Sequence, residues 1–335
     1  MNKILLPVLL SFAVAACHAD EPYHFIKEIP IGTDGGWDYL SVDSAAQRLY
    51  VSHGTKVVVI DLVKDAVAGE ITNTPGVHGL APAPELGRGL VTCGRENKAA
   101  IVDLKTLEIL SKVDTGANPD GMLYEPGRQE FYTFNGRGQS ATVIDAKSGK
   151  VVATIPLGGK PEFAAADPKA GRVYDNLEDQ SEVVVIDIRS HTVVTNWPIA
   201  PGEEGSGMAM DRANHRLFIG CGGSKTMVMM DSTSGRVVAS VPIGGGVDAN
   251  AFDPATQFAF ASCGDGTTTI AHEDGDRLTV VQTLKTERSA RTMTIDPATH
   301  KIYLASAKFE APAEGQRRGK MVPGSFKILV YGMDK

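Results

Sequence analysis

Acidic and imidazole side chains recur at one position of the sequence, about every 42 residues. The residues at this first repeated position are Asp38, His78, Asp120, Glu162, Ser206, Asp248 and Arg291, with spacings of 40, 42, 42, 44, 42 and 43. Carboxylates that converge on one place repel one another unless a cation or ordered water offsets the repulsion. Oxygen ligands suit Ca²⁺ or Mg²⁺, and an imidazole also admits Zn²⁺ or Mn²⁺.

Three chemical roles are open for this set. Asp38, His78, Asp120, Glu162 and Asp248 are candidate metal ligands. In a catalytic role, His78 or Glu162 is the candidate general base, with or without a metal that activates water. In the third interpretation, the polar side chains only line a water-filled channel. The sequence alone leaves these alternatives open.

A second repeated position gathers the cysteines. It holds His53, Cys93, Asn135, Leu177, Cys221, Cys263 and Ser306, and a glycine follows each cysteine. One interpretation is a small residue packed under a turn, and another is ligation of a soft metal or haem by Cys and His. A disulfide between Cys221 and Cys263 is a third, which would leave one thiol free. We count His53 among the candidate ligand-binding residues, and expect His191, His215, His272 and His300 to be solvent-exposed.

The elements that must position these residues follow from the same repeat. Each copy contains a short strand ending in a turn such as Asp253-Pro254, a second strand, a Gly-rich turn, a third strand and, in most copies, a fourth. Seven copies predict an all-β, seven-bladed β-propeller with four-stranded blades. The last copy lacks its outer strand, and residues 24–32 (HFIKEIPIG) supply it and close the ring. In a propeller both repeated positions face one mouth of the central channel.

The N-terminus predicts export. Residues 1–19 have one early Lys and an uncharged apolar run, which is typical of a signal peptide, and 22–335 form the single propeller domain. Cleavage is open between a lipobox ending at Cys17, which would be lipidated, and a site after Ala19. We therefore expect the periplasm or cell envelope, with membrane contact only through a lipid anchor. A net charge of -7 argues against nucleic acid as a partner.

The seventh copy carries a long insertion between its second and third strands. The 18 residues between Ser306 and Ser325 include Lys308, Arg317, Arg318 and Lys320. Long loops on rigid scaffolds are often functional. One interpretation is a lid over the channel mouth that selects a small anionic molecule together with Arg291; the other is a surface insertion without a role.

Two stretches resemble a known family. YVSHGTKVVVIDL (50–62) and VIDAKSGKVVATIPLG (143–158) are similar to the YVTN repeat of secreted seven-bladed propellers, the YncE-like family. The resemblance covers residues 22–335 and implies the propeller fold and export. Its relatives include lactonases, surface-layer proteins and propellers encoded beside quinoprotein dehydrogenases. It supplies no catalytic motif to transfer.

The functional expectation has two alternatives. The first is a non-catalytic exported propeller that binds a small ligand, a metal or a partner such as an envelope protein through Asp38, Asp120, Asp248, Arg291, His53, Arg317 and Arg318. The second is a divalent-metal-dependent hydrolase, for example a lactonase, or a lyase at the same mouth. The sequence has no GxSxG, P-loop, HExxH or CxxCH motif, so no standard catalytic class is indicated.

Overall fold

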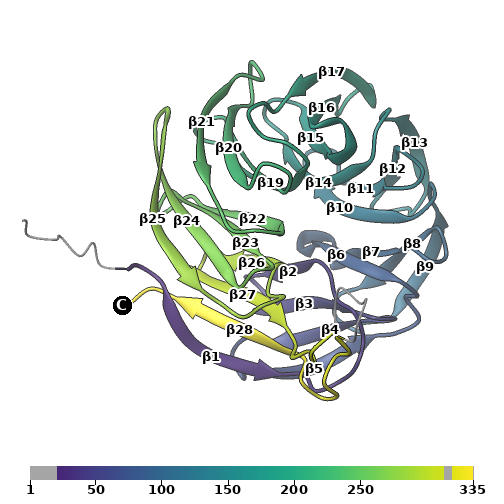
Figure 1. Cartoon of the computed structure of the whole chain (residues 1–335). Coiled ribbons are helices and arrows are strands. Elements are labelled where there is room, and N and C mark those ends of the chain that lie inside the picture. Colours follow the sequence, from purple (N-terminus) through teal and green to yellow (C-terminus); the bar gives the residue numbers. More distant parts are fainter. Residues whose placement is uncertain (1–20, 313–318, 335) are drawn as a thin grey trace, which may run out of the picture.

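Seven four-stranded antiparallel sheets form a ring (Figure 1). The computed structural model describes residues 21–312 and 319–334. In six of the sheets consecutive strands pair and the first is the innermost; in the seventh, the N-terminal strand pairs with the last strand of the chain and is the outermost. The predicted seven-bladed propeller is therefore confirmed.

The blades follow the repeat in order. Blade 1 has β2 (Leu40–Asp43), β3 (Arg48–His53), β4 (Lys56–Asp61) and β5 (Ala66–Ile71); blade 2 has β6 (Val77–Ala83), β7 (Arg88–Cys93), β8 (Lys98–Asp103) and β9 (Ile109–Asp114). Blade 3 has β10 (Pro119–Glu125), β11 (Glu130–Asn135), β12 (Ser140–Asp145) and β13 (Val151–Pro156); blade 4 has β14 (Pro161–Asp167), β15 (Arg172–Leu177), β16 (Glu182–Asp187) and β17 (Thr192–Pro198). Blade 5 has β18 (Gly205–Asp211), β19 (Arg216–Cys221), β20 (Thr226–Asp231) and β21 (Val237–Pro242); blade 6 has β22 (Val247–Asp253), β23 (Phe258–Cys263), β24 (Thr267–Asp274) and β25 (Arg277–Lys285). Blade 7 has β26 (Met293–Asp296), β27 (Lys301–Ser306), β28 (Lys327–Gly332) and β1 (His24–Pro30), and two 3-10 turns are η1 (Pro84–Leu86) and η2 (Glu178–Gln180).

The aspartate that ends the third strand of most blades is a turn residue. The carboxylate of Asp145 accepts hydrogen bonds from the amide and the hydroxyl of Ser148, and Asp187 and Asp231 do the same for Ser190 and Ser234. Such Asp-led turns occupy the backbone donors of a tight connection. This repeated aspartate therefore has a structural role in the turn. The first repeated position is the better candidate for a functional site.

The N-terminal strand closes the ring. β1 pairs antiparallel with β28, from His24 opposite Gly332 to Pro30 opposite Lys327, as the sequence predicted. Just before it, the backbone N–H and C=O of Tyr23 bond the side-chain amide of Gln282 on β25 at 2.9 and 2.7 Å. Pairing of the N-terminal strand with the C-terminal one thus covers the outer edge of β28, which would otherwise be unpaired. Within the described residues, no helix has the length and apolar character that a membrane span needs.

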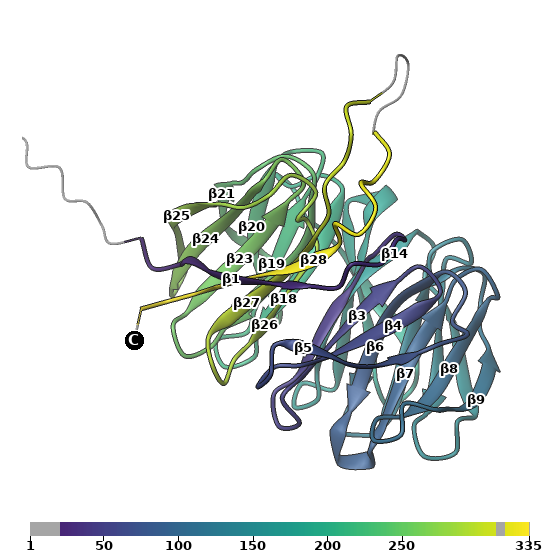
Figure 2. The same cartoon turned by 90° about the horizontal axis from the view of Figure 1, so that it is seen from below.

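The described part of the insertion of the seventh copy is an arm whose two segments are joined by an isolated β-bridge between Phe309 and Met321. We call residues 308–312 and 319–322 the blade-7 arm. Glu310 N–H donates to the carbonyl of Lys320 at 2.9 Å, and Val322 N–H donates to that of Lys308 at 2.8 Å. Figure 2 shows the yellow arm standing off one face of the ring. Arg317 and Arg318 lie outside the described residues, so their predicted ligand-binding role stays a prediction.

Candidate functional site

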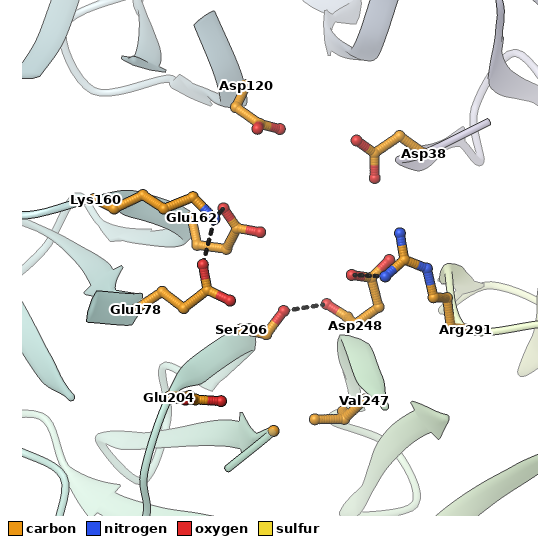
Figure 3. Close-up of a pocket in the computed structure, with 11 residues that line it drawn as sticks. Asp38, Asp120, Lys160, Glu162, Glu178, Glu204, Ser206, Val247, Asp248 and Arg291 are labelled. Atoms are coloured by element: carbon orange, nitrogen blue, oxygen red, sulfur yellow. Dashed lines mark hydrogen bonds and ion pairs between the residues drawn. The ribbon is translucent and has the colours of Figure 1, made fainter. Parts of the chain in front are cut away.

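The first repeated position comes together around one cavity. His78, Asp120, Glu162, Ser206 and Asp248 are second residues of the innermost strands β6, β10, β14, β18 and β22, while Asp38 and Arg291 lie two positions before the first residues of β2 and β26. A cavity of about 330 Å³, which we call the acidic cavity, is lined by all of these except His78 (Figure 3). Equivalent positions of a ring-shaped repeat therefore converge at one end of its axis.

His78 lies between two carboxylates at the edge of this cavity. Its Nδ1 is 2.7 Å from Asp38 Oδ2 and 3.0 Å from Asp120 Oδ1. Burial by itself lowers the pKa of His78, but the hydrogen bonds and charges of Asp120 and Asp38 outweigh it and raise this pKa to about 10. Burial raises the pKa of Asp38, and the bond to His78 opposes that rise. The Nδ1–H of protonated His78 thus faces two carboxylate acceptors.

The same three side chains form a group with metal-ligand geometry. One ligand atom from each of Asp38, His78 and Asp120 lies within 4.8 Å of the other two, and in the described part of the chain no other group of three or more His, Cys, Asp or Glu does so. Ligand atoms at roughly 2.0–2.2 Å from one ion are about 3 Å or slightly more apart. The two N–O distances above are close to that separation.

Two carboxyls on the other side of the cavity lack full hydrogen bonding. Burial, and then the charge of Asp120, raise the pKa of Glu162 to about 8. Burial, and then the charge of Asp38, raise the pKa of Asp248 to about 7. Glu162 Oε2 and Asp248 Oδ2 are buried and accept no hydrogen bond. Perturbed carboxyls in a cavity are typical of functional sites, although structural networks also produce them.

Negative charge exceeds positive charge around the cavity. Lys160 pairs with Glu178 and lies 3.6 Å from Glu162, and Arg291 Nη1 lies 3.3 Å from Asp248 Oδ1. Among the described residues, six carboxylates line the cavity: Asp38, Asp120, Glu162, Glu178, Glu204 and Asp248. The cations are Lys160, Arg291 and protonated His78. Because Asp248 holds its proton up to about pH 7 and Glu162 up to about pH 8, the net negative potential that would attract a further cation grows as the pH rises through these values.

Three of these lining residues were not found from the sequence. Lys160 and Glu204 lie two positions before the first repeated position, and Glu178 directly follows the second one. The position of Glu178 is glycine in five of the other copies, at 54, 94, 136, 222 and 264. Glu178 could have been recognised from the sequence, because it is a charged residue at a position where most repeats have glycine.

Two aromatic rings meet beside the acidic residues. The ring of Tyr39, the residue after Asp38, stacks on that of Phe163, the residue after Glu162, with centroids 4.3 Å apart. The Tyr39 hydroxyl donates to the backbone carbonyl of Glu162 at 3.3 Å. Burial, reinforced by the surrounding carboxylates, raises the pKa of Tyr39 well above its usual value, so the phenol stays protonated.

The second repeated position is core. Cys93, Cys221 and Cys263 are buried free thiols at the ends of β7, β19 and β23, so the disulfide alternative between Cys221 and Cys263 is wrong. None of them joins a ligand group within the described residues. Each cysteine packs in an inter-blade cluster, which supports packing under the turn.

The other histidines also take structural positions. His53 is 1% exposed and stacks on Phe326 with centroids 4.2 Å apart, and burial lowers its pKa. The geometry places it away from the acidic cavity and gives no support to its predicted ligand role. His215 is exposed, as expected. The same prediction is wrong for His191, whose side chain is 14% exposed and whose Nε2 lies 2.9 Å from Glu130 Oε2. His272 and His300 are half-buried, and His300 bonds Asp253 at 2.7 Å.

Comparison with known proteins does not assign the chain to a family. No protein-family model matches the chain, and a search of curated proteins gives no match. The chain is a seven-bladed β-propeller. The arguments about its function therefore rest on the acidic cavity and its surroundings.

Proposed function

We propose that this propeller is an exported, non-catalytic binding protein whose acidic cavity takes up a divalent metal ion. The observation that supports this most directly is the Asp38–His78–Asp120 group, whose ligand atoms lie within 4.8 Å of one another. The excess of carboxylates around the cavity adds long-range attraction for a cation. Its partner would be that ion, alone or with a small molecule or an envelope protein.

The donor types favour some ions over others. One imidazole nitrogen and two carboxylates suit Zn²⁺ or Mn²⁺ better than Ca²⁺ or Mg²⁺, which prefer oxygen ligands alone. His78 would have to give up its Nδ1 proton to bind the ion through that atom, because only neutral imidazole is a ligand. Affinity for the ion should therefore increase with pH.

Export and family membership belong to the same proposal. The apolar N-terminal run supports secretion, and the sequence resemblance supports a place among YVTN-repeat, YncE-like propellers. Both agree with a site that operates outside the cytoplasm. The role of Cys17 in lipid anchoring lies outside the described residues.

A second candidate function has one observation in its favour. Glu162 has a pKa near 8 and an oxygen without a hydrogen bond at the same cavity. A carboxyl that titrates near neutral pH suits general acid–base catalysis. In that case the protein would be a metal-dependent hydrolase, such as a lactonase, or a lyase, with Glu162 or His78 as the base.

Metal titration tests the first proposal. Purified protein treated with EDTA would be titrated with Zn²⁺, Mn²⁺, Ca²⁺ and Mg²⁺ by calorimetry, and the bound metal measured by elemental analysis. We expect one ion per chain, with Zn²⁺ or Mn²⁺ tightest, and at least about 100-fold weaker binding in Asp38→Asn and Asp120→Asn, because even indirect partners of a ligand contribute 10–100-fold. Asp114→Asn is the control, since its carboxyl is exposed on β9. Absence of stoichiometric binding by all four ions would overturn the proposal.

Activity assays separate the two functions. The metal-loaded protein would be tested on p-nitrophenyl acetate and on a γ-lactone. Turnover that disappears in both Asp38→Asn and Glu162→Gln would establish the hydrolase. Metal binding without turnover would support the non-catalytic role.

A further inference from the structure

A second, larger hollow opens beside the acidic cavity. This groove has a volume of about 1370 Å³ and lies between the blade-7 arm and the segments that enter blades 1 and 7. Arg291 lines both the groove and the acidic cavity, so the two are neighbours on one face of the ring. Pockets for small organic ligands usually measure roughly 300–1,000 Å³. The groove therefore has room for an organic ligand, whereas the acidic cavity is at the lower end of this range and its polar lining suits an ion with its water.

One wall of the groove is apolar. The rings of Trp37 and Phe309 pack with centroids 6.1 Å apart, and Met321 pairs with Phe309 across the blade-7 arm. All three are half-buried and line the groove, so part of each side chain faces it. Aromatic and thioether side chains are the usual contacts for a flat apolar body.

The charged side chains that line the groove favour an anionic ligand. Two of the acids there are already satisfied: Glu287 bonds Lys327 at 2.8 Å and Ser306 at 3.0 Å. Asp265 accepts from the amide of Gly245 at 2.6 Å and from the hydroxyl of Thr267 at 2.7 Å.

The basic side chains of the groove are less engaged. Within the described residues, Arg288 and Lys308 make no ion pair, and Arg291 is 51% exposed with one contact to Asp248. Of the acids that line the groove, Asp265 and the exposed Glu310 make no ion pair in the same part of the chain, although Asp265 accepts the two hydrogen bonds given above. The three basic side chains thus outnumber the two acids that lack an ion-pair partner.

We propose that the groove binds a small amphipathic anion, with its flat apolar body against Trp37 and Phe309 and its anionic group at Arg288. This site is separate from the proposed metal site and does not need the ion. The arginine fork supplies directional donors for a carboxylate, sulfonate or phosphate, which the acidic cavity next door repels.

A matched pair of fluorescent probes tests the proposal. 8-Anilinonaphthalene-1-sulfonate carries the anionic group, and N-phenyl-1-naphthylamine has the same aromatic body without it. Titrations in EDTA should show one sulfonate probe per chain, bound about tenfold or more tightly than the neutral probe. Equal affinities would overturn the proposal, because the groove would then recognise only apolar surface. Loss of probe binding on EDTA treatment would also overturn it, whereas failure of metal binding would not affect it.

Substitution of Arg288 tests whether this side chain binds the anionic group. Arg288→Gln should weaken the sulfonate probe about tenfold and leave the neutral probe unchanged. Arg277→Gln is the control, because Arg277 is an exposed arginine of blade 6 that does not line the groove. An unchanged sulfonate affinity in Arg288→Gln would contradict the assigned contact.

The two tryptophans locate the probe. Trp37 lines the groove and Trp197 lies on β17 of blade 4, so Trp197→Phe leaves Trp37 as the one remaining tryptophan donor. The bound sulfonate probe should quench Trp37 emission strongly by energy transfer in this variant. Weak transfer at saturation would place the probe elsewhere and overturn the proposal.

Discussion

Tyr39 of blade 1 stacks on Phe163 of blade 4, with ring centroids 4.3 Å apart and planes inclined by 29°. Each ring comes from the residue that directly follows a member of the acidic set, Asp38 and Glu162. Tyr39 lies between Asp38 and the start of β2, and Phe163 lies within β14. The stack thereby joins blades 1 and 4, which are not neighbours in the ring, next to the backbone of Glu162.

Removing one ring should destabilise the protein measurably. Phe163→Leu keeps an apolar side chain but loses the stack, so we expect the free energy of unfolding to fall by about 1–2 kcal/mol. Tyr39→Phe retains both rings and loses one bond of 3.3 Å, and should change the free energy by less than about 1 kcal/mol. Urea denaturation measures both. Phe25→Leu is the control, because Phe25 is half-exposed on β1 and makes an edge contact with Tyr331. Equal losses in Phe163→Leu and the control would show that the stack contributes no more than that exposed edge contact.

The raised pKa values of Glu162 and His78 predict that the free energy of unfolding decreases as the pH rises. The folded protein holds the Glu162 proton up to about pH 8, whereas an ordinary glutamate releases it near pH 4.5. It holds the His78 proton up to about pH 10, against an ordinary value of 6.5. The unfolded chain binds fewer protons in both windows, so stability is lost as pH rises through them. In EDTA, we expect a loss of about 3 kcal/mol between pH 6 and pH 9, after allowance for partial exposure.

Glu162→Gln separates the two contributions. The amide is neutral at every pH, so the variant should lose the part of the slope between about pH 4.5 and 8 and be more stable than the original protein at pH 9. Thermal unfolding at a series of pH values measures this. An unchanged slope would mean that Glu162 is not protonated in the folded protein at neutral pH.

The fold was predictable because its signal is repeated seven times. Near-constant spacing fixes the blades, and the same spacing places Asp38, Asp120 and Glu162 at equivalent points of a ring. A missing fourth strand in the last copy predicted that residues 24–32 complete it, and β1 does pair with β28. Each of these conclusions depends on backbone periodicity, to which all copies contribute.

Contacts between different side chains were harder to predict. A shared register does not tell which neighbours meet, so the selective approach of His78 to Asp38 and Asp120 was not visible in the spacing. His53 occupies a repeated position too, yet Phe326 covers it because the insertion of the last copy returns to β28 there. The repeat fixes where a side chain starts, and blade-specific packing decides whether it reaches the cavity.

The amide of Gln282 should be essential for fastening the N-terminal strand. It bonds both backbone groups of Tyr23, whose hydroxyl in turn donates to the carbonyl of His300 at 2.7 Å. Gln282→Ala leaves two buried backbone groups unpaired and should cost about 2 kcal/mol. Hydrogen exchange of the β1 amides should accelerate more than that of β28. Gln180→Ala, at an exposed position of η2, is the control, and equal protection of β1 in both variants would contradict this role.

The three core thiols should be chemically inert in the folded protein. Burial raises the pKa of Cys93 and Cys221 to about 11 and that of Cys263 to about 12. Since the thiolate is the reactive form, about one thiol in a thousand or fewer is activated at pH 8, and none is accessible to reagent. Iodoacetamide followed by peptide mass spectrometry should show no label at these positions in the native state and full labelling in guanidinium without a reductant. Failure to label Cys221 and Cys263 in guanidinium until a reductant is added would reveal a disulfide and contradict the free thiols of the folded core.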